Sequence, residues 1–148
     1  MKYIDKLRNS GLRPTKQRLQ ICEVLFDTEK TFHFTINELD QKMTVEEVNT
    51  LATDPLFTVG AHSHTHRVMS FLPPKDLDAE VSSSIRCLKQ WTGQEIYHYS
   101  YPEGLAHCYS EAVIDCLKEH GILCSPSAIE GSNNENTDLF HLKRIFVV

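Results

Sequence analysis

Residues 57–66 of the chain are Phe-Thr-Val-Gly-Ala-His-Ser-His-Thr-His, an apolar stretch that runs directly into three histidines. The apolar part, residues 57–61, predicts a buried strand, so the histidines stand at its carboxyl end. In α/β barrels and open α/β sheets, active sites lie at the carboxyl ends of the strands. This stretch therefore predicts an α/β fold and also the place of a functional site within it.

The spacing of the histidines predicts a metal site. His62 and His66 are four residues apart, which places both imidazoles on one side of the segment if it turns helically. Imidazole is the commonest protein ligand of zinc-class ions, at about 2.0–2.1 Å. We therefore predict that His62 and His66 bind a divalent metal, zinc being the expected ion, and that His64 points elsewhere. A catalytic zinc needs a third protein ligand from another part of the chain. The alternative is a polar loop that merely contains many histidines.

The elements expected around this stretch alternate between strands and helices. A capping box at Thr44 and Glu47 begins a helix that ends at Asp54-Pro55. After the histidines, the pattern predicts a helix from Pro73-Pro74 to about residue 91, a strand at 96–101, a helix at 110–120, and strands at 122–124 and 140–148. This order is typical of parallel βαβ units, so the expected fold class is α/β, as an open sheet or part of a barrel.

The first 43 residues differ in charge from the remainder. Residues 1–43 carry eight Lys and Arg against six Asp and Glu, a net charge of +2, whereas residues 44–148 carry seven against fourteen, a net charge of −7. Short helices are expected at 3–9, 15–27 and 35–42, in the manner of a helix-turn-helix unit. We therefore predict a helical segment at 1–43, followed by an acidic domain at 44–148 that disfavours nucleic acid.

Composition also limits where the chain can work. No apolar run approaches the roughly 20 residues that cross a bilayer, so no membrane span is predicted. Charges interrupt the N-terminus where a signal peptide has an apolar block, so we expect no export of the chain as given. The five cysteines form no C-x-x-C pair, which favours reduced thiols in a cytoplasm. Four of them are expected to be small buried side chains: Cys87, Cys108, Cys116 and Cys124.

Residues 44–148 resemble the polysaccharide deacetylase, or NodB-homology, family. His62-Ser63-His64-Thr65-His66 is similar to the family's H-[S/T]-x-x-H motif, whose outer histidines bind the metal and map to His62 and His66. Three later segments are similar to its F-A-Y-P-Y-G strand end, its V-x-x-L-K-x-x-G helix and its D-x-F-x-L-x-R-I segment: residues 99–104, 112–121 and 138–145. The resemblance implies a partial deacetylase-type (β/α) barrel that hydrolyses N- or O-acetyl groups on carbohydrate.

The resemblance also implies roles for individual residues. In this family the metal polarises the acetyl carbonyl and activates a water, and a carboxylate takes the proton of that water. Backbone N–H groups of Tyr101 and Gly104 would lie in the region that stabilises the oxyanion. Tyr101 and Pro102 would contact the sugar. Glu103 replaces the family's aromatic residue and, as the acid adjacent to the presumed site, is the candidate for the base.

Two departures from the family pattern predict impaired chemistry. Family members begin with a strand ending in T-F-D-D-G, which supplies the base and the third metal ligand, and this sequence contains no Asp-Asp pair. The sequence ends at Val148, before the strand that carries the family's late catalytic histidine. We therefore expect weak or absent deacetylase activity from this chain alone. Missing strands would leave sheet edges exposed, which predicts self-association.

Residues 1–42 resemble a second family, the ferric uptake regulators. Residues 7–18 are similar to that family's L-R-x-x-G-L-R-x-T-x-Q-R opening, and residues 32–39 to its H-x-T-x-x-E-L helix start. This resemblance implies the alternative function, a truncated metal-responsive DNA-binding regulator.

The basic residues of this segment would then be the DNA contacts, namely Arg13, Lys16 and Arg18. Without a recognition helix they would give weak, salt-sensitive contact with phosphates. Because both resemblances are incomplete where they meet near Met43, a fused or truncated reading frame is indicated. A remnant with neither activity is the third hypothesis.

Overall fold

The computed structural model describes residues 3–9, 13–16, 19 and 43–145. The helix expected at 35–42 lies outside the described residues, and so does most of the one expected at 15–27. The helix α1 (Ile4–Asn9) confirms the expectation at 3–9. The Leu19 N–H donates to the Thr15 carbonyl at 3.0 Å, which is the hydrogen bond of one α-helical turn.

The helix α4 (Val45–Thr53) begins at the predicted capping box. The Glu47 N–H donates to Thr44 Oγ1 at 3.2 Å, and the Thr44 N–H donates to Glu47 Oε2 at 2.7 Å. These two bonds satisfy backbone donors that no helical carbonyl can reach, and therefore they determine where the helix starts. The helix ends at Thr53, and its C-cap, Asp54, stands directly before Pro55.

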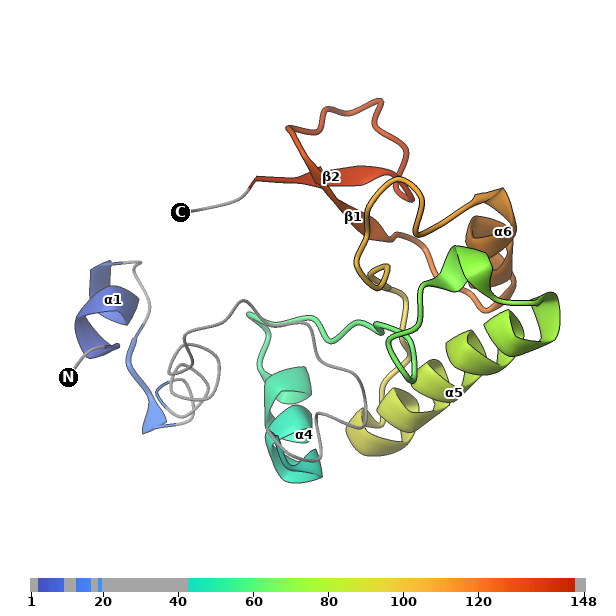
Figure 1. The fold of residues 1–148 in the computed structure, drawn as a ribbon. Helices are drawn as coiled ribbons and strands as arrows, with labels where there is room; N and C mark the ends of the chain where they lie inside the picture. The colour runs from blue at the N-terminus through green and yellow to red at the C-terminus, as the bar shows by residue number, and fades with distance from the viewer. Residues whose placement is uncertain (1–2, 10–12, 17–18, 20–42, 146–148) are drawn as a thin grey trace.

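The longest helix of the described residues, α5 (Pro74–Thr92), packs against two other helices. Proline in the first turn and Gly93 in a left-handed conformation (φ +67°) set its two ends, which lie close to the predicted bounds. It lies against α4 and against α6 (Glu111–Glu119), and α6 also contacts the short 3₁₀ helix η1 (Met69–Phe71) (Figure 1). Its buried side recurs every three or four residues: Leu77, Glu80, Val81, Ser84, Ile85, Leu88 and Thr92.

Every strand pairing among residues 43–145 is parallel, as the βαβ pattern predicts. Ala61 pairs with Tyr99 and His98 pairs with Cys124, each as an isolated bridge. Two regular strands, β1 (Pro126–Glu130) and β2 (Leu142–Arg144), pair over a register shift between Pro126 and Glu130. The expected α/β class is therefore confirmed.

The predicted strands at 57–61, 96–101 and 122–124 are wrong in length, because only isolated bridge residues remain: Ala61 in the first, His98 and Tyr99 in the second, and Cys124 in the third. In two of these segments, a backbone N–H group forms the turn that ends the preceding helix. The Phe57 N–H donates to the Asp54 carbonyl at 3.1 Å, and the Ile122 N–H donates to the Leu117 carbonyl at 3.0 Å. Backbone groups used in these turns are not available for a ladder.

The hydrophobic core lies between α5, α6 and the bridged segments. Its largest fully buried side chains include Tyr99, Tyr101, Met69 and Leu117. Of the four cysteines expected to be buried, Cys108 is buried and the other three are partly buried, all as free thiols. No helix in the described part of the chain is both long and apolar enough to cross a membrane.

Two glycines provide a matched test of packing behind the site. Gly93 (φ +67°) and Gly104 (φ +70°) both adopt the left-handed conformation, which costs an L-residue about 1–2 kcal/mol. A Cβ on Gly104 would lie 2.6 Å from the Ala128 backbone nitrogen, whereas a Cβ on Gly93 meets nothing within 4 Å. We expect Gly93→Ala to cost about 1 kcal/mol of unfolding free energy and Gly104→Ala about 3 kcal/mol, by urea denaturation. Equal losses would contradict the close approach at Gly104.

Candidate metal centre

The imidazoles of His62 and His66 converge. Their Nε2 atoms are 3.1 Å apart, and the rings meet edge to face with centroids 4.9 Å apart. Two nitrogens bound to one tetrahedral zinc ion at about 2.0–2.1 Å are separated by roughly 3.3 Å. The separation of the two Nε2 atoms is therefore close to what a single ion requires.

The convergence does not come from a helical turn. Ser63 and His66 have φ values of +63° and +59°, so the segment contains two left-handed residues and forms no helix. Such residues cost about 1–2 kcal/mol each unless their surroundings hold them in place. The two rings do lie on the same side, as expected, but a strained loop places them there rather than a helical turn.

The His62 ring is oriented by the neighbouring strand segment. Its Nδ1 atom lies 2.8 Å from the Ser100 carbonyl oxygen. Because a carbonyl oxygen only accepts, Nδ1 carries the proton and Nε2 presents a lone pair. The Ser100 N–H in turn donates to the Ala61 carbonyl at 2.8 Å. The pairing of two strand segments therefore sets the tautomer of His62, as is usual for metal-binding histidines.

The loop at residues 63–65 closes around the carboxylate of Glu80 on α5. Glu80 Oε2 accepts hydrogen bonds from Ser63 Oγ (3.0 Å), the His64 N–H (2.9 Å) and the Thr65 N–H (2.9 Å). Glu80 Oε1 accepts from Thr65 Oγ1 at 2.5 Å. Ser63 Oγ also accepts the His66 N–H at 2.9 Å. This network holds the backbone between the two metal-ligand candidates.

Glu80 is a functional residue that the sequence analysis missed. It is 8% exposed and lies on the buried side of α5, among apolar residues such as Leu77 and Val81. A carboxylate on the apolar side of an amphipathic helix is rarely buried without partners. That pattern is the signal that could have identified Glu80.

Glu103 lies beside the pair, at the outer edge of the His66 ring. Its Oε1 atom is 3.9 Å from His66 Nδ1, whereas His66 Nε2 faces His62. Glu103 has a φ of +60°, and the Gly104 N–H donates to the Pro102 carbonyl at 2.6 Å, closing a tight turn. A carboxylate at this edge is placed to orient the ring. Its role as the base stays a prediction.

The side chains of Tyr101 and Pro102 belong to the core. Tyr101 is 1% exposed, its hydroxyl donates to the Phe140 carbonyl at 2.9 Å, and its ring stacks on Tyr109 at a centroid distance of 4.1 Å. Both side chains are buried in this structure, and their contact with a sugar stays a prediction. The Gly104 N–H is already bonded to Pro102, so the oxyanion donor expected there is occupied. The Tyr101 backbone donor stays a prediction.

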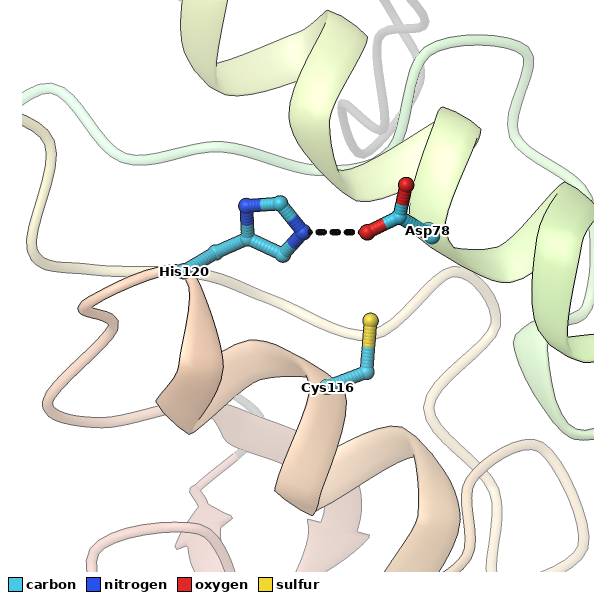
Figure 2. A group of neighbouring side chains, drawn as sticks. All are labelled: Asp78, Cys116 and His120. Atoms are coloured by element: carbon cyan, nitrogen blue, oxygen red, sulfur yellow. Dashed lines mark hydrogen bonds and ion pairs between the residues drawn. The ribbon is translucent and has the colours of Figure 1, made fainter.

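Within the described part of the chain, no third ligand-type side chain joins the pair in a three-residue group. One such group lies elsewhere, formed by Asp78, Cys116 and His120, with ligand atoms all within 4.8 Å of one another (Figure 2). The sequence analysis interpreted Cys116 as a core residue. The missed signal is the spacing of Cys116 and His120, four residues apart on one side of α6.

Of the basic residues proposed to contact DNA, Arg13 and Lys16 are exposed, and Arg18 lies outside the described residues.

The sequence of residues 18–125 matches the family model for polysaccharide deacetylases. That match covers well over half of the chain and includes the histidine pair, Glu80 and the Tyr101–Gly104 turn. The chain belongs to the polysaccharide deacetylase family. No curated protein sequence matches it at a significant level.

Solved structures of polysaccharide deacetylases share the fold. The Streptococcus pyogenes deacetylase PplD in complex with acetate has a TM-score of 0.64 at 17% identity, over 72% of this chain and 46% of that one. The deacetylase domain of BpsB from Bordetella bronchiseptica has a TM-score of 0.65 at 17% identity, over 83% and 57%. A CE4 family pseudoenzyme from Bacillus anthracis has a TM-score of 0.53 at 18% identity, over 72% and 37%. This polysaccharide deacetylase chain thus spans roughly half the length of the solved relatives or less.

These comparisons confirm the expected mixed α/β fold as part of a polysaccharide deacetylase domain. The family match begins at residue 18, within the segment that resembles ferric uptake regulators, and none of these findings supports a regulator segment at 1–42. A domain boundary near Met43 and self-association through sheet edges stay predictions.

Replacing Glu80 with glutamine tests the loop. Glutamine can keep an oxygen for the two backbone N–H groups, but it lacks the negative charge that strengthens all four hydrogen bonds, so we expect Glu80→Gln to lower the free energy of unfolding at pH 7 by about 2–4 kcal/mol. Glu95, an exposed glutamate paired with Lys89, provides the control. Glu95→Gln should cost less than about 1 kcal/mol. Urea denaturation measures both, and a small loss in Glu80→Gln would show that the loop does not depend on the carboxylate.

The same variant predicts a dependence on pH. Burial alone would raise the pKa of Glu80, but the hydrogen bonds from Thr65, His64 and Ser63 outweigh it and hold the pKa below its ordinary value of 4.5. Because the pKa is lower in the folded state, the advantage of the parent chain over Glu80→Gln should be complete above that value and disappear as the pH falls through the folded pKa. Melting temperatures of both proteins, measured at several pH values from about 3 to about 7, test this expectation.

Proposed function

We propose that this chain is a metal-dependent carbohydrate deacetylase domain in which His62 and His66 hold a divalent ion, zinc fitting best. The observation that carries the proposal is the 3.1 Å approach of the two Nε2 atoms, with His62 Nδ1 bonded to the Ser100 carbonyl. Membership in the polysaccharide deacetylase family supports acetylated carbohydrate as the substrate class and hydrolysis of acetyl groups as the reaction.

The hydrogen bonding of the pair supports the proposal further. Since His62 Nδ1 carries a proton, its Nε2 accepts, and the 3.1 Å contact is completed by the proton on His66 Nε2. A cation takes the place of that shared proton. His66 then carries its proton on Nδ1, the atom that faces the Glu103 carboxylate at 3.9 Å. Both rings thus have a partner for the tautomer that metal binding requires.

These contacts give each residue of the proposed site a distinct role. A bound ion supplies Lewis acidity, which polarises an acetyl carbonyl and makes water a better nucleophile at neutral pH. His62 and His66 position the ion, the Glu80 network keeps their loop closed, and Glu103 orients His66. Because neither a base nor a third ligand is assigned among the described residues, we propose slow acetyl hydrolysis by this chain. A solved CE4 relative described as a pseudoenzyme shows that the fold also exists without activity.

Removal of either histidine tests the metal centre. We expect His62→Ala and His66→Ala each to lower the bound zinc by one ion per chain and to abolish acetate release from an acetylated chitooligosaccharide. The matched control is His64→Ala, in the same loop, whose side chain we do not assign to the ion. Zinc content after dialysis and enzymatic acetate detection are the measurements. Zinc content unchanged in both single variants would refute the ligand assignment.

A second pair of measurements decides what Glu103 does. If it orients His66, Glu103→Gln weakens zinc binding by up to about tenfold and lowers acetate release at limiting zinc, with activity restored by excess zinc. If it is the base, zinc affinity stays unchanged and acetate release is lost at every zinc concentration. We expect the first result. Glu135→Gln, in the exposed loop before β2, is the control and should change neither quantity.

A further inference from the structure

A second set of ligand-type side chains meets between α5 and α6. Asp78 comes from α5, whereas Cys116 and His120 come from α6 and its C-cap. None of the three contributes to the His62–His66 pair or to the Glu80 network. We propose that Asp78, Cys116 and His120 form a second cation site that binds a zinc-class ion and joins α5 to α6. The inference does not rest on the proposed deacetylase activity.

The geometry of the three side chains suits one ion. His120 Nε2 lies 2.7 Å from Asp78 Oδ1, and all three ligand atoms lie within 4.8 Å of one another. Figure 2 shows the Cys116 sulfur directed towards the His120–Asp78 pair. Around a tetrahedral zinc ion, the separations between such ligand atoms are roughly 3.3–3.6 Å. Side-chain rotations that bring the separations between the ligand atoms, which are at most 4.8 Å, into this range would therefore complete the site.

The donor set selects the class of ion. A thiolate, an imidazole and a carboxylate are all zinc ligands, and a soft sulfur donor disfavours magnesium and calcium. Asp78 is exposed and His120 is half-buried, so an ion can enter from solvent and a water can fill the fourth position. The arrangement thus has three protein ligands and an accessible fourth position.

A catalytic cysteine is the competing interpretation, because a thiol, an imidazole and a carboxylate can also form a nucleophilic triad. The contacts disagree with it. The His120 Nε2 atom bonds to Asp78, so the imidazole is not aligned to take a proton from sulfur. Burial, followed by the negative charges of Asp78 and Glu119, raises the pKa of Cys116 to about 11. Without an ion the thiol keeps its proton at neutral pH and is a poor nucleophile. Binding of a zinc-class ion would displace that proton, and the negative charges nearby attract a cation.

An ion at this position would reinforce the helix that supports the first site. Asp78 lies two residues before Glu80 on α5, on the exposed side of the helix, while Glu80 faces the loop at 63–65. Joining Asp78 to two residues of α6 would hold the first half of α5 against its neighbour. Because the ion binds the folded chain, zinc should raise the melting temperature.

Cobalt(II) distinguishes the two sites, because only the second contains sulfur. Titrated into the full chain, cobalt should produce a near-ultraviolet thiolate-to-cobalt charge-transfer band whose final intensity corresponds to one sulfur-bound ion per chain and which is removed by added zinc. The band should be lost in Cys116→Ser and should need a higher cobalt concentration to form in His120→Ala. It should persist in the double variant His62→Ala/His66→Ala, in which the proposed deacetylase site is absent.

Cys124→Ser is the matched control, since Cys124 is also a partly buried free thiol and is not part of the group. It should keep the band. Circular dichroism shows whether each variant is folded, and Asp78→Asn, at an exposed position, provides a ligand variant that is not expected to disturb folding. Absence of the band in the parent chain would overturn the proposal. A band that persists in Cys116→Ser, or that Asp78→Asn leaves unchanged in affinity, would do so as well.

Discussion

The arrangement of the candidate metal centre depends on one buried carboxylate. Glu80 is ionised in a place from which water is largely excluded, and a charge in that position needs hydrogen-bond donors around it. The loop at 63–65 supplies four of them, two from backbone N–H groups and two from hydroxyls. In return, the carboxylate holds Ser63 and His66 in left-handed conformations that they would otherwise avoid. The convergence of the two imidazoles follows from these hydrogen bonds between the loop and Glu80.

The remaining constraints on the centre come from segments distant in sequence. The Ser100 carbonyl sets the tautomer of His62, and Glu103 lies at the outer edge of His66. Both belong to the segment that pairs with Ala61 and then turns at Gly104, where only a glycine fits against Ala128. Parallel pairing therefore brings the carbonyl, the carboxylate and the histidine loop to the same edge. This is the general reason why α/β folds carry their sites at the carboxyl ends of strands.

The helix α5 contributes one side chain to each of two separate groups. Its buried side carries Glu80, and its exposed side carries Asp78, which meets Cys116 and His120 of the neighbouring helix. A fold of this family can keep such supporting contacts whether or not the chemistry is retained, because stability and catalysis depend on different residues. That separation agrees with the presence of both deacetylases and a pseudoenzyme among the solved relatives.

The sequence by itself determined the features that rest on local hydrogen bonds and periodicity. These include the start of α4 at its capping box, the ends of α5 and α6, and the parallel α/β class. Only the tertiary structure decided the strand lengths, the partners of Glu80, the burial of Tyr101 and the meeting of Asp78 with Cys116. Helix ends are set by neighbours a few residues away, whereas a buried carboxylate or a bridge between strands is set by groups far along the chain, whose approach no local pattern encodes.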